Sequence, residues 1–377
     1  MTDYRFIEPL DVLYLRGNTL FGDAGGHGAA LMPPWPSLAA GALRAQCLVA
    51  HGIDPSAYAH GAPLPDDLHR CLGTPELPGT FRLRAFTLAR RCAAGGIEPL
   101  FPLPADVVVV NRQPHVLRPM PAHSALRSSY PLSHLPTLPA EAGKPESGNW
   151  LTAAGMSAYL RGVALDRDRH LVPSAKLWQT DSRLGIALNP TRRSAEEGRI
   201  YTTETVALCR DVGFIAGVDG MDGLLPEAGL LRFGGDGRGA RMETCTPDWP
   251  QPDWSVLAAG TGFRLLLTTP GLFPGGWELP GLTADRQWPV GSKIAVLQAA
   301  AVSRPQVISG WDLAYWQPKP AQRLVPSGSV YWLEQREGLT ITVLQTLVES
   351  GLPVAEPTRR AEGFNNILIA AWPQLNR

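Results

Sequence analysis

Cysteine is scarce in this sequence, and its pattern excludes two classes of stabilised domain. Five cysteines occur among 377 residues, and no two of them form a C-x-x-C pair. An odd, widely spaced set argues against a disulfide framework and against a zinc site. We therefore expect no bound metal, and reduced cysteines packed in the core, where free cysteine is common; they are Cys47, Cys71, Cys92, Cys209 and Cys245.

Long apolar runs and a net charge are also absent. No run reaches the roughly 18 apolar residues that cross a bilayer, and the stretch from Met1 to Glu8 is charged where a secretory signal would be apolar. We therefore expect a cytoplasmic globular protein. Arginine plus lysine balances aspartate plus glutamate at 34 each, whereas nucleic-acid-binding proteins usually carry a basic excess. A neutral total does not exclude a local basic groove, but it gives no argument for one.

Motifs of common nucleotide-processing enzymes are missing as well. The sequence has no adjacent His-Asp pair, no G-x-x-x-x-G-K-[ST] loop and no paired-carboxylate cluster. These motifs hold the metal ions and phosphates in such enzymes. We therefore expect no cofactor.

Glycine and proline are abundant and spread along the chain, 39 and 36 respectively, which predicts many short elements and a sheet-rich protein. A strand-like segment at residues 4–15 precedes a glycine-rich loop, Gly22 to Ala29, that holds His27. A helix is expected to follow, with Ser37 as its cap and Gly52 after its end. Residues 93–149 contain many prolines and little periodicity, so we expect an irregular insertion without its own core.

The later part of the chain repeats one order of elements. Two β-type runs, 199–209 and 212–220, are separated by two residues and predict a hairpin; a helix (221–231) and a glycine-rich turn feeding a strand follow. Further on, strands at 263–271, 293–302, 306–316 and 327–335 precede a helix at 340–351 and a closing strand at 367–372. The repeated order predicts an α+β protein of two ferredoxin-like (RRM-like) domains. Their predicted bounds are 1–247, with an insertion at about 93–195, and 248–377.

Seven segments, spread in order over most of the chain, carry a family resemblance. They are PLDVLYLRGNTLF (Pro9 to Phe21), PPWPSLAAGALRAQ (Pro33 to Gln46), PLPADVV (Pro102 to Val108), SRLGIALNPTRRSAEEGRIYT (Ser182 to Thr202), LRFGGDGRGARME (Leu231 to Glu243), TTPGLFPGGW (Thr268 to Trp277) and ISGWDLAYWQPKPAQRLVPSGSVYWLE (Ile308 to Glu334). Together they resemble the RAMP proteins of CRISPR systems, and in particular the family of the third subunit of the type III-B (Cmr) effector complex. The resemblance implies a non-catalytic subunit that binds the 5′ handle of the guide RNA (crRNA). It also implies two protein partners, the large polymerase-like subunit and the backbone RAMP subunit.

The best candidate for RNA contact is the segment from Gly234 to Arg241. Glycines let backbone N–H groups approach a phosphate, and arginines supply charge, although a plain tight turn with solvated arginines explains the same residues. The resemblance favours RNA contact, because RAMP loops of this kind contact the guide. The predicted RNA-binding residues are Arg16, Arg44, Arg183, Arg192, Arg193, Gly234, Gly235, Arg238, Arg241, Lys319 and Arg323.

Two segments leave alternatives open. Around Lys319, aromatic residues such as Trp311 and Trp316 suit base stacking, but the alternation of Trp311, Leu313 and Tyr315 suits the core face of a half-buried strand at least as well. Near the C-terminus the family tends to have a glycine-x-glycine turn, and here Asn365 replaces the second glycine. This replacement puts a phosphate contact in doubt, although asparagine tolerates the positive φ of such a turn.

Catalysis by histidine is the main alternative function. Some RAMP relatives cut CRISPR repeat RNA with a histidine, and His27, His115, His123, His134 and His170 are available. His27 in its glycine-rich loop could act as a general base towards a 2′-hydroxyl. The sequence offers no fixed partner for it, such as a second histidine or a lysine and tyrosine, so we expect a non-catalytic protein. A metal-independent repeat endoribonuclease and a purely structural scaffold remain the two alternatives.

Overall fold

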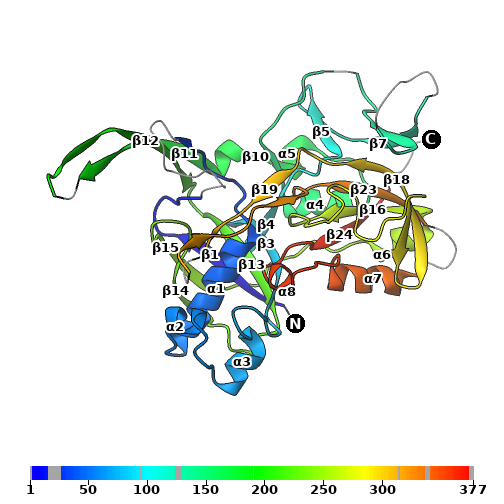
Figure 1. Cartoon of the computed structure of the whole chain (residues 1–377). Helices are drawn as coiled ribbons and strands as arrows, with labels where there is room; N and C mark the ends of the chain where they lie inside the picture. The colour runs from blue at the N-terminus through cyan, green and yellow to red at the C-terminus, as the bar shows by residue number, and fades with distance from the viewer. Residues whose placement is uncertain are drawn as a thin grey trace. The chain divides into compact units, whose positions relative to one another are not determined.

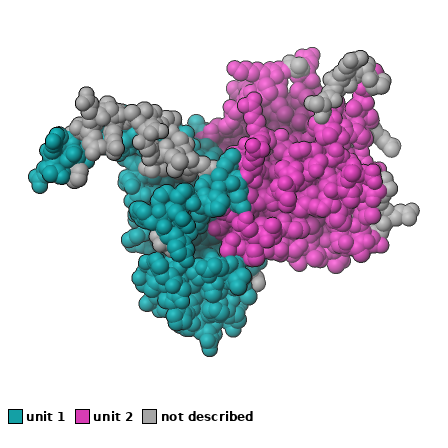
Figure 2. All heavy atoms as spheres, viewed as in Figure 1, with its two compact units in different colours: residues 1–97, 175–246, 307–322 teal, residues 98–174, 247–306, 323–377 magenta. Residues whose placement is uncertain are grey.

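The computed structural model describes two compact units, each a mixed α/β structure built on antiparallel sheets (Figure 1). The described residues are 2–15, 27–93, 95–123, 130–141, 143–189, 191–312, 315–335 and 340–372. Unit 1 comprises Met1–Ile97, Ala175–Thr246 and Val307–Gln322, and unit 2 comprises Glu98–Ser174, Pro247–Gln306 and Arg323–Arg377 (Figure 2). The predicted division at residue 247 differs from these units, since residues 98–174 cluster with the second unit.

Unit 1 is centred on an antiparallel sheet with the strand order β3-β13-β1-β15-β14. The strands are β1 (Asp3–Pro9), β3 (Arg82–Arg91), β13 (Val212–Asp219), β14 (Ala228–Arg232) and β15 (Gly239–Thr244). Phe6 and Ile7 of β1 are fully buried. They pair in register with Ile215 and Phe214 of β13, and on the other side with Glu243 and Met242 of β15.

Helix α1 (Pro36–Ala50) packs against β3 and β14, and confirms the first predicted helix. Its cap differs from the prediction. Ser37 lies inside the helix, and Trp35 at the N-cap makes no side-chain capping bond. Pro36 begins the helix because its fixed φ suits the first helical position and its missing N–H has no partner to lose there. The short helices α2 (Pro55–Ala59) and α3 (Asp66–Leu72) follow.

A long two-stranded ribbon, β11 (Trp178–Asn189) with β12 (Ser194–Leu208), completes unit 1 together with two shorter pieces. Strand β2 (His27–Gly28) runs parallel to β12, and β20 (Trp311–Asp312) pairs with β21 (Gln317–Pro318). The predicted hairpin of 199–209 with 212–220 is wrong, because β12 pairs with β11 while β13 pairs with β1 and β3. Both runs have β periodicity, but their partners lie far away in the sequence.

The predicted helix at 221–231 is also wrong. A turn containing Asp222 and Gly223, both at positive φ, is followed by strand β14. Pro226 removes a backbone donor in the middle of the segment, which disfavours a helix. Met221 and Leu225 are buried in the turn, so the apolar spacing reflects core contacts of a turn.

The five cysteines were expected to pack in the core. All five are free, but only Cys47 and Cys71 are buried, and Cys92 is exposed.

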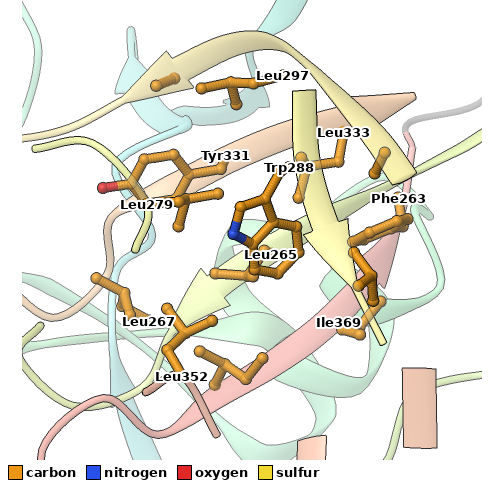
Figure 3. Packing of buried hydrophobic residues seen from close by; sticks show 14 of the residues in the cluster. Phe263, Leu265, Leu267, Leu279, Trp288, Leu297, Tyr331, Leu333, Leu352 and Ile369 are labelled. Carbon is orange, nitrogen blue, oxygen red and sulfur yellow. The ribbon is translucent and has the colours of Figure 1, made fainter. Parts of the chain in front are cut away.

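Unit 2 is built on a second antiparallel sheet with the order β17-β18-β23-β16-β24. The strands are β16 (Gly262–Leu267), β17 (Gln287–Val290), β18 (Lys293–Ala301), β23 (Val330–Gln335) and β24 (Ile367–Ala371). On one face lies a core centred on Trp288, Leu265, Phe263 and Ile369 (Figure 3). Helix α7 (Ile341–Ser350), which confirms the predicted C-terminal helix, adds Leu344 to this core; the other helices of this part are α6 (Trp254–Ala259) and α8 (Pro357–Ala361).

The other face of this sheet is covered by residues 98–174. Phe101, Val109 and Tyr159 pack there against Leu266 and Trp332 in a single buried cluster. The elements of this layer are β4 (Ile97–Pro102), β5 (Val107–Val110), β6 (Gln113–Val116), β7 (Arg118–Pro121), β8 (His134–Thr137), β9 (Asn149–Leu151), β10 (Leu171–Pro173), α4 (Ala153–Leu160) and α5 (Arg167–His170).

The predicted irregular segment, residues 93–149, contains short strands of this layer, and its buried residues share their core with the second sheet. The strands are too short, and too interrupted by proline, to show periodicity in the sequence.

Candidate functional site

Three segments that are distant in the sequence meet around Tyr14 in unit 1. Leu13 and Val206 of β12 exchange two backbone hydrogen bonds of 2.8 Å, and the carbonyl of Tyr14 accepts the N–H of Gly235 at 2.9 Å. The segment 11–15 therefore lies between β12 and the glycine-rich loop that joins β14 to β15. We call this group, made of residues 11–15, 181–183 and 233–239, the Tyr14 cluster.

Glycine is required in this loop by its backbone. Gly234 and Gly237 have φ of +91° and +63°, in the region that favours glycine. A Cβ at Gly234 would lie 3.1 Å from the carbonyl oxygen of Tyr14. The close approach that was predicted for a phosphate is thus made to the chain itself. The N–H of Gly235 already donates to Tyr14 and cannot bind a phosphate without releasing it.

Arg238 lies across the Tyr14 ring and is paired with an acid. Its Nη1 is 2.6 Å from Oδ2 of Asp11, and its guanidinium carbon is 5.1 Å from the ring centroid. The side chain of Asp11 is 61% exposed, and exposed ion pairs of this kind contribute only about 0–1 kcal/mol. A phosphate can therefore compete with Asp11 for this guanidinium at little cost.

Arg183 of β11 approaches the same tyrosine from the ribbon. Its guanidinium donates to Asp181 at 2.9 Å, and this bond, with a smaller contribution from the Tyr14 hydroxyl, raises the pKa of Arg183. Sequence reasoning selected Arg183 and Arg238 but not Tyr14 or Asp11. Both missed residues lie in the first of the seven resembling segments, and that position was the only signal for them.

Two exposed arginines, Arg192 and Arg193, lie at the tip of the ribbon. Asn189 shapes the turn there, since its side-chain oxygen accepts the N–H groups of Thr191 and Arg192 at 3.0 Å. Arg193 has φ of +52° and donates its N–H to the carbonyl of Asn189. Arg192 and Arg193 are exposed, and neither forms an ion pair with a described residue.

Arg44 is directed into the fold and lies apart from these arginines. Its Nη2 donates to the hydroxyl of Tyr58 at 3.0 Å and to the carbonyl of Leu72 at 3.2 Å, and its guanidinium lies near the Phe81 ring. These contacts join α1 to the two short helices after it. A structural role therefore accounts for this arginine.

The remaining predicted residues are distributed over three places. Arg241 is exposed on β15, opposite Glu8 and Leu230. Lys319 is exposed in unit 1 after β21, whereas Arg323 is exposed in unit 2 on β22 (Gln322–Leu324). A further short strand is β19 (Gln306–Ile308). Arg16 lies outside the described residues.

The aromatic residues near Lys319 are exposed, whereas the C-terminal turn at Asn365 is buried. Trp311 and Trp316 are 46% and 74% exposed, so the core-packing interpretation of these aromatics is wrong. Asn365 has φ of +63°, which confirms that asparagine supports the turn. It is fully buried, and its side chain bonds to Leu272 and Pro353, so this turn is filled by the chain itself.

The candidate histidines lie in both units: His27 belongs to unit 1, and the other four belong to unit 2. His27 pairs through its backbone with Thr202, and its side chain lies outside the described part of the chain. His170 is buried in unit 2, and its Nδ1 accepts the N–H of Asp166 at 2.9 Å. Burial, assisted by Arg169, lowers the pKa of His170, which suits this acceptor role.

We expect acid to destabilise unit 2 through His170. The folded protein holds this imidazole neutral, while the unfolded chain titrates near pH 6.5. The unfolded state therefore binds the proton more readily, and stability falls as the pH drops below about 6.5 towards the lowered pKa. Thermal unfolding between pH 7.5 and 5 measures this loss, and His170→Gln, which keeps an acceptor, should reduce it. An identical pH dependence in the variant would rule out His170 as its source.

Within the described ranges, no helix has the length and apolar character needed to cross a membrane. The described histidine, cysteine, aspartate and glutamate residues form no group of three or more that could hold a metal ion.

Comparison with known proteins relates the chain to one family. The family model described as CRISPR-associated protein (Cas_Cmr3) matches residues 5–372. One similar solved chain belongs to the cryo-EM structure of the type III-B Cmr-beta bound to cognate target RNA, with a TM-score of 0.51, 15% identity, and coverage of 97% of this chain and 96% of that one. A second, from the same assembly with target RNA and AMPPnP, has a TM-score of 0.46 and 14% identity, and covers 95% of this chain and 92% of that one. No curated protein matches the sequence. At 15% identity, the similarity of this chain to the first of these solved chains supports a shared fold.

Proposed function

This chain belongs to the Cas_Cmr3 family of CRISPR-associated proteins, and we propose that it is a non-catalytic RNA-binding subunit of a type III-B (Cmr) effector complex. In this role it holds the 5′ handle of the guide RNA for antiviral defence in the cytoplasm. The observation that carries the proposal is the family match over residues 5–372. A solved chain of similar fold comes from a Cmr assembly bound to target RNA, which supports an RNA-containing context.

The geometry of unit 1 supports RNA contact at two places. At the Tyr14 cluster, Arg238 lies over the ring of Tyr14, and its ion-pair partner among the described residues is an exposed acid, Asp11. At the ribbon tip, Arg192 and Arg193 are both exposed. Phosphate contacts of this kind position a nucleic acid without reading its sequence.

We further propose that both sheets are ferredoxin-like. The orders β15-β1-β13-β3 and β24-β16-β23-β18 both read 4-1-3-2 when the strands of each sheet are numbered along the chain. This is the strand order of the ferredoxin-like βαββαβ motif. In the described residues, the first sheet has α1 at the first helix position and β14 in place of the second helix. The second sheet has β17 in place of the first helix and α7 at the second position.

As protein partners we propose the large polymerase-like subunit and the backbone RAMP subunit, which this chain would bridge. The irregular, proline-rich sequence of residues 93–149 is typical of a segment that orders against a partner, which here would be the large subunit. Most of them instead belong to the layer that covers the second sheet. Only the exposed edge of that layer is therefore a candidate for docking.

We expect the double variant Arg192→Ala/Arg193→Ala to weaken handle binding in a salt-dependent way. Each lost phosphate contact on a single strand lowers the slope of log K against log salt by about 0.7, so the pair should lower it by about 1.4. The measurement is guide-RNA affinity of the assembled complex at several salt concentrations. Arg210→Ala is the matched control, because Arg210 is 95% exposed in the same unit but outside the proposed contacts. An unchanged slope would exclude the ribbon tip as a phosphate contact.

Two alternatives give different results. A metal-independent repeat endoribonuclease would cleave repeat RNA, and the His27→Ala variant would lose that cleavage. A purely structural scaffold would give no crosslinks between the handle and the residues near Arg238 or Lys319 in the assembled complex. Handle crosslinks at these residues without cleavage would support the proposal over both alternatives.

A further inference from the structure

The hairpin of β20 and β21 exposes aromatic side chains that a folded core would normally bury. Trp311, Tyr315 and Trp316 are 46%, 64% and 74% exposed. Scattered exposed apolar residues need no explanation. Here, however, three large aromatic side chains lie within six residues of one short hairpin, in which Trp311 pairs with Pro318.

The two tryptophans form a defined pair. Their ring centroids are 5.9 Å apart and the ring planes are at 89°, an edge-to-face arrangement. In this geometry the edge of one ring covers a single face of the other, so indole faces remain open to the solvent. The pair holds the rings in place, which lowers the entropy cost of stacking a third ring on them.

The backbone at Trp316 is strained. Its φ is +51°, which is a genuine outlier for a bulky residue. Such strain costs about 1–3 kcal/mol and persists where the surroundings enforce it, often at binding sites. The carboxylate of Asp312 accepts the N–H of Tyr315, the residue before Trp316, at 3.2 Å. With this strained backbone the Trp316 side chain is exposed.

A cation follows the hairpin directly. Lys319 is exposed and comes next after Pro318, the residue that pairs with Trp311. Two bonds set its backbone: its N–H donates to the carbonyl of Gly310 at 2.8 Å, and its carbonyl accepts the hydroxyl of Ser309 at 2.8 Å. Its aliphatic stem passes the Cα of Gly310, where a Cβ would lie 3.7 Å from Cδ. Prolines at 318 and 320 flank it and restrict the backbone.

From this arrangement we propose that the hairpin is a stacking site for an unpaired RNA base, with Trp316 as the platform and Lys319 on the adjacent phosphate. Aromatic rings combined with a cation are the common chemistry of single-strand binding, because every base has a π-face and a neighbouring phosphate. The exposed large apolar side chains among the described residues of 311–319 are all aromatic, and Lys319 adds a cation beside them in the sequence. The inference rests on the proposed function and assigns an unpaired base to a place that the phosphate contacts do not cover.

The test uses the assembled complex with guide RNAs that carry 2-aminopurine at one unpaired handle position at a time. Stacking on an indole quenches this base, so one position should be quenched in the wild type and recover in Trp316→Ala. We expect Trp316→Ala to weaken RNA binding about 5- to 150-fold, the range for the loss of one stacked base. Trp316→Phe should retain most of the affinity, and Lys319→Ala should lower the salt slope by about 0.7.

Controls separate this inference from the proposed function. Leu77→Ala removes a side chain that is 68% exposed elsewhere in unit 1 and should leave binding unchanged. If the wild-type complex holds the guide but Trp316→Ala binds equally well and no position recovers fluorescence, the stacking site is refuted and the proposed function stands. If Trp316→Ala releases a protein subunit while its RNA affinity is unchanged, the hairpin is a protein-docking surface and the inference is wrong. If the wild-type complex binds no guide, the proposed function itself fails.

Discussion

Replacing Asp106 by alanine is expected to lower the free energy of unfolding of unit 2 by about 3–5 kcal/mol, because it leaves a buried guanidinium unpaired. Asp106 and Arg264 are both fully buried, and Nη1 of Arg264 lies 2.8 Å from Oδ2 of Asp106. A charge that loses its partner inside a protein keeps its full desolvation penalty. The effect should therefore exceed that of any surface ion pair in the chain.

The pair is the centre of a hydrogen-bond network that joins two layers. Arg264 on β16 donates from Nε to the carbonyl of Ala371 at 2.9 Å and from Nη2 to the carbonyl of Tyr159 at 2.8 Å. The hydroxyl of Tyr159 donates to Asp106 at 2.8 Å, and burial raises the Tyr159 pKa well above its usual value, so the donor proton is retained. Residues 98–174 are thus tied to the second sheet by charge as well as by apolar contact.

Urea unfolding followed by tryptophan fluorescence measures this loss. Asp222→Asn is the control, since its ion pair with Arg70 has side chains 61% and 56% exposed and should contribute about 0–1 kcal/mol, and asparagine tolerates the positive φ at this position. Replacing both partners, as in Asp106→Leu with Arg264→Met, should be less harmful than Asp106→Ala alone, because no unpaired charge remains. Equal losses for Asp106→Ala and Asp222→Asn would contradict this account.

The elements that could be predicted from the sequence are those with one clear periodicity and a local signal at each end. Helices α1 and α7 have apolar residues at helical spacing, and each is followed by glycine within two residues. Strand β24 is a short apolar run that is buried at every position. In these cases the local pattern and the tertiary environment agree, so the local pattern suffices.

The elements that could not be predicted depend on partners that are distant in the sequence. Strands β12 and β13 are separated by a turn and both have β character, yet each pairs with strands elsewhere. Nothing within the run 199–220 distinguishes this outcome from a hairpin. The same limit applies to residues 98–174, whose four-residue strands gain their stability from the face of the second sheet.

In the candidate site too, some residues have a local signal in the sequence and others depend on distant partners. The glycine-rich loop was found because glycines cluster there, but its partner, Tyr14, lies 221 positions before Gly235 and gave no local signal. Arg44 matched the family segment, and only its contacts with Tyr58 and Leu72 reveal a structural role. Residue type predicts which groups can bind RNA, and tertiary contacts decide which of them are available.

A second large effect is expected at Asn365, where asparagine stands in place of the glycine that is usual in the family. Its φ of +63° suits glycine, but its side chain has taken over two bonds: Oδ1 accepts the N–H of Leu272 at 2.6 Å, and Nδ2 donates to the carbonyl of Pro353 at 2.7 Å. Both partners are backbone groups, and Asn365 is fully buried. Leaving such groups unsatisfied costs about 1–3 kcal/mol each.

We therefore expect Asn365→Gly to destabilise unit 2 by roughly 1–5 kcal/mol although it restores the usual glycine, because relief of about 1 kcal/mol of left-handed strain offsets only part of the loss at the two groups. Asn365→Leu should cost more, about 3 kcal/mol or above, because it adds the strain of a left-handed backbone to the same two lost bonds. Asp236→Gly is the control: Asp236 has a similar φ of +62° but an exposed side chain, so glycine there should leave stability unchanged or raise it. Urea unfolding of the three variants gives the comparison. An Asn365→Gly protein as stable as the wild type would show that the turn needs only its backbone conformation and not these two bonds.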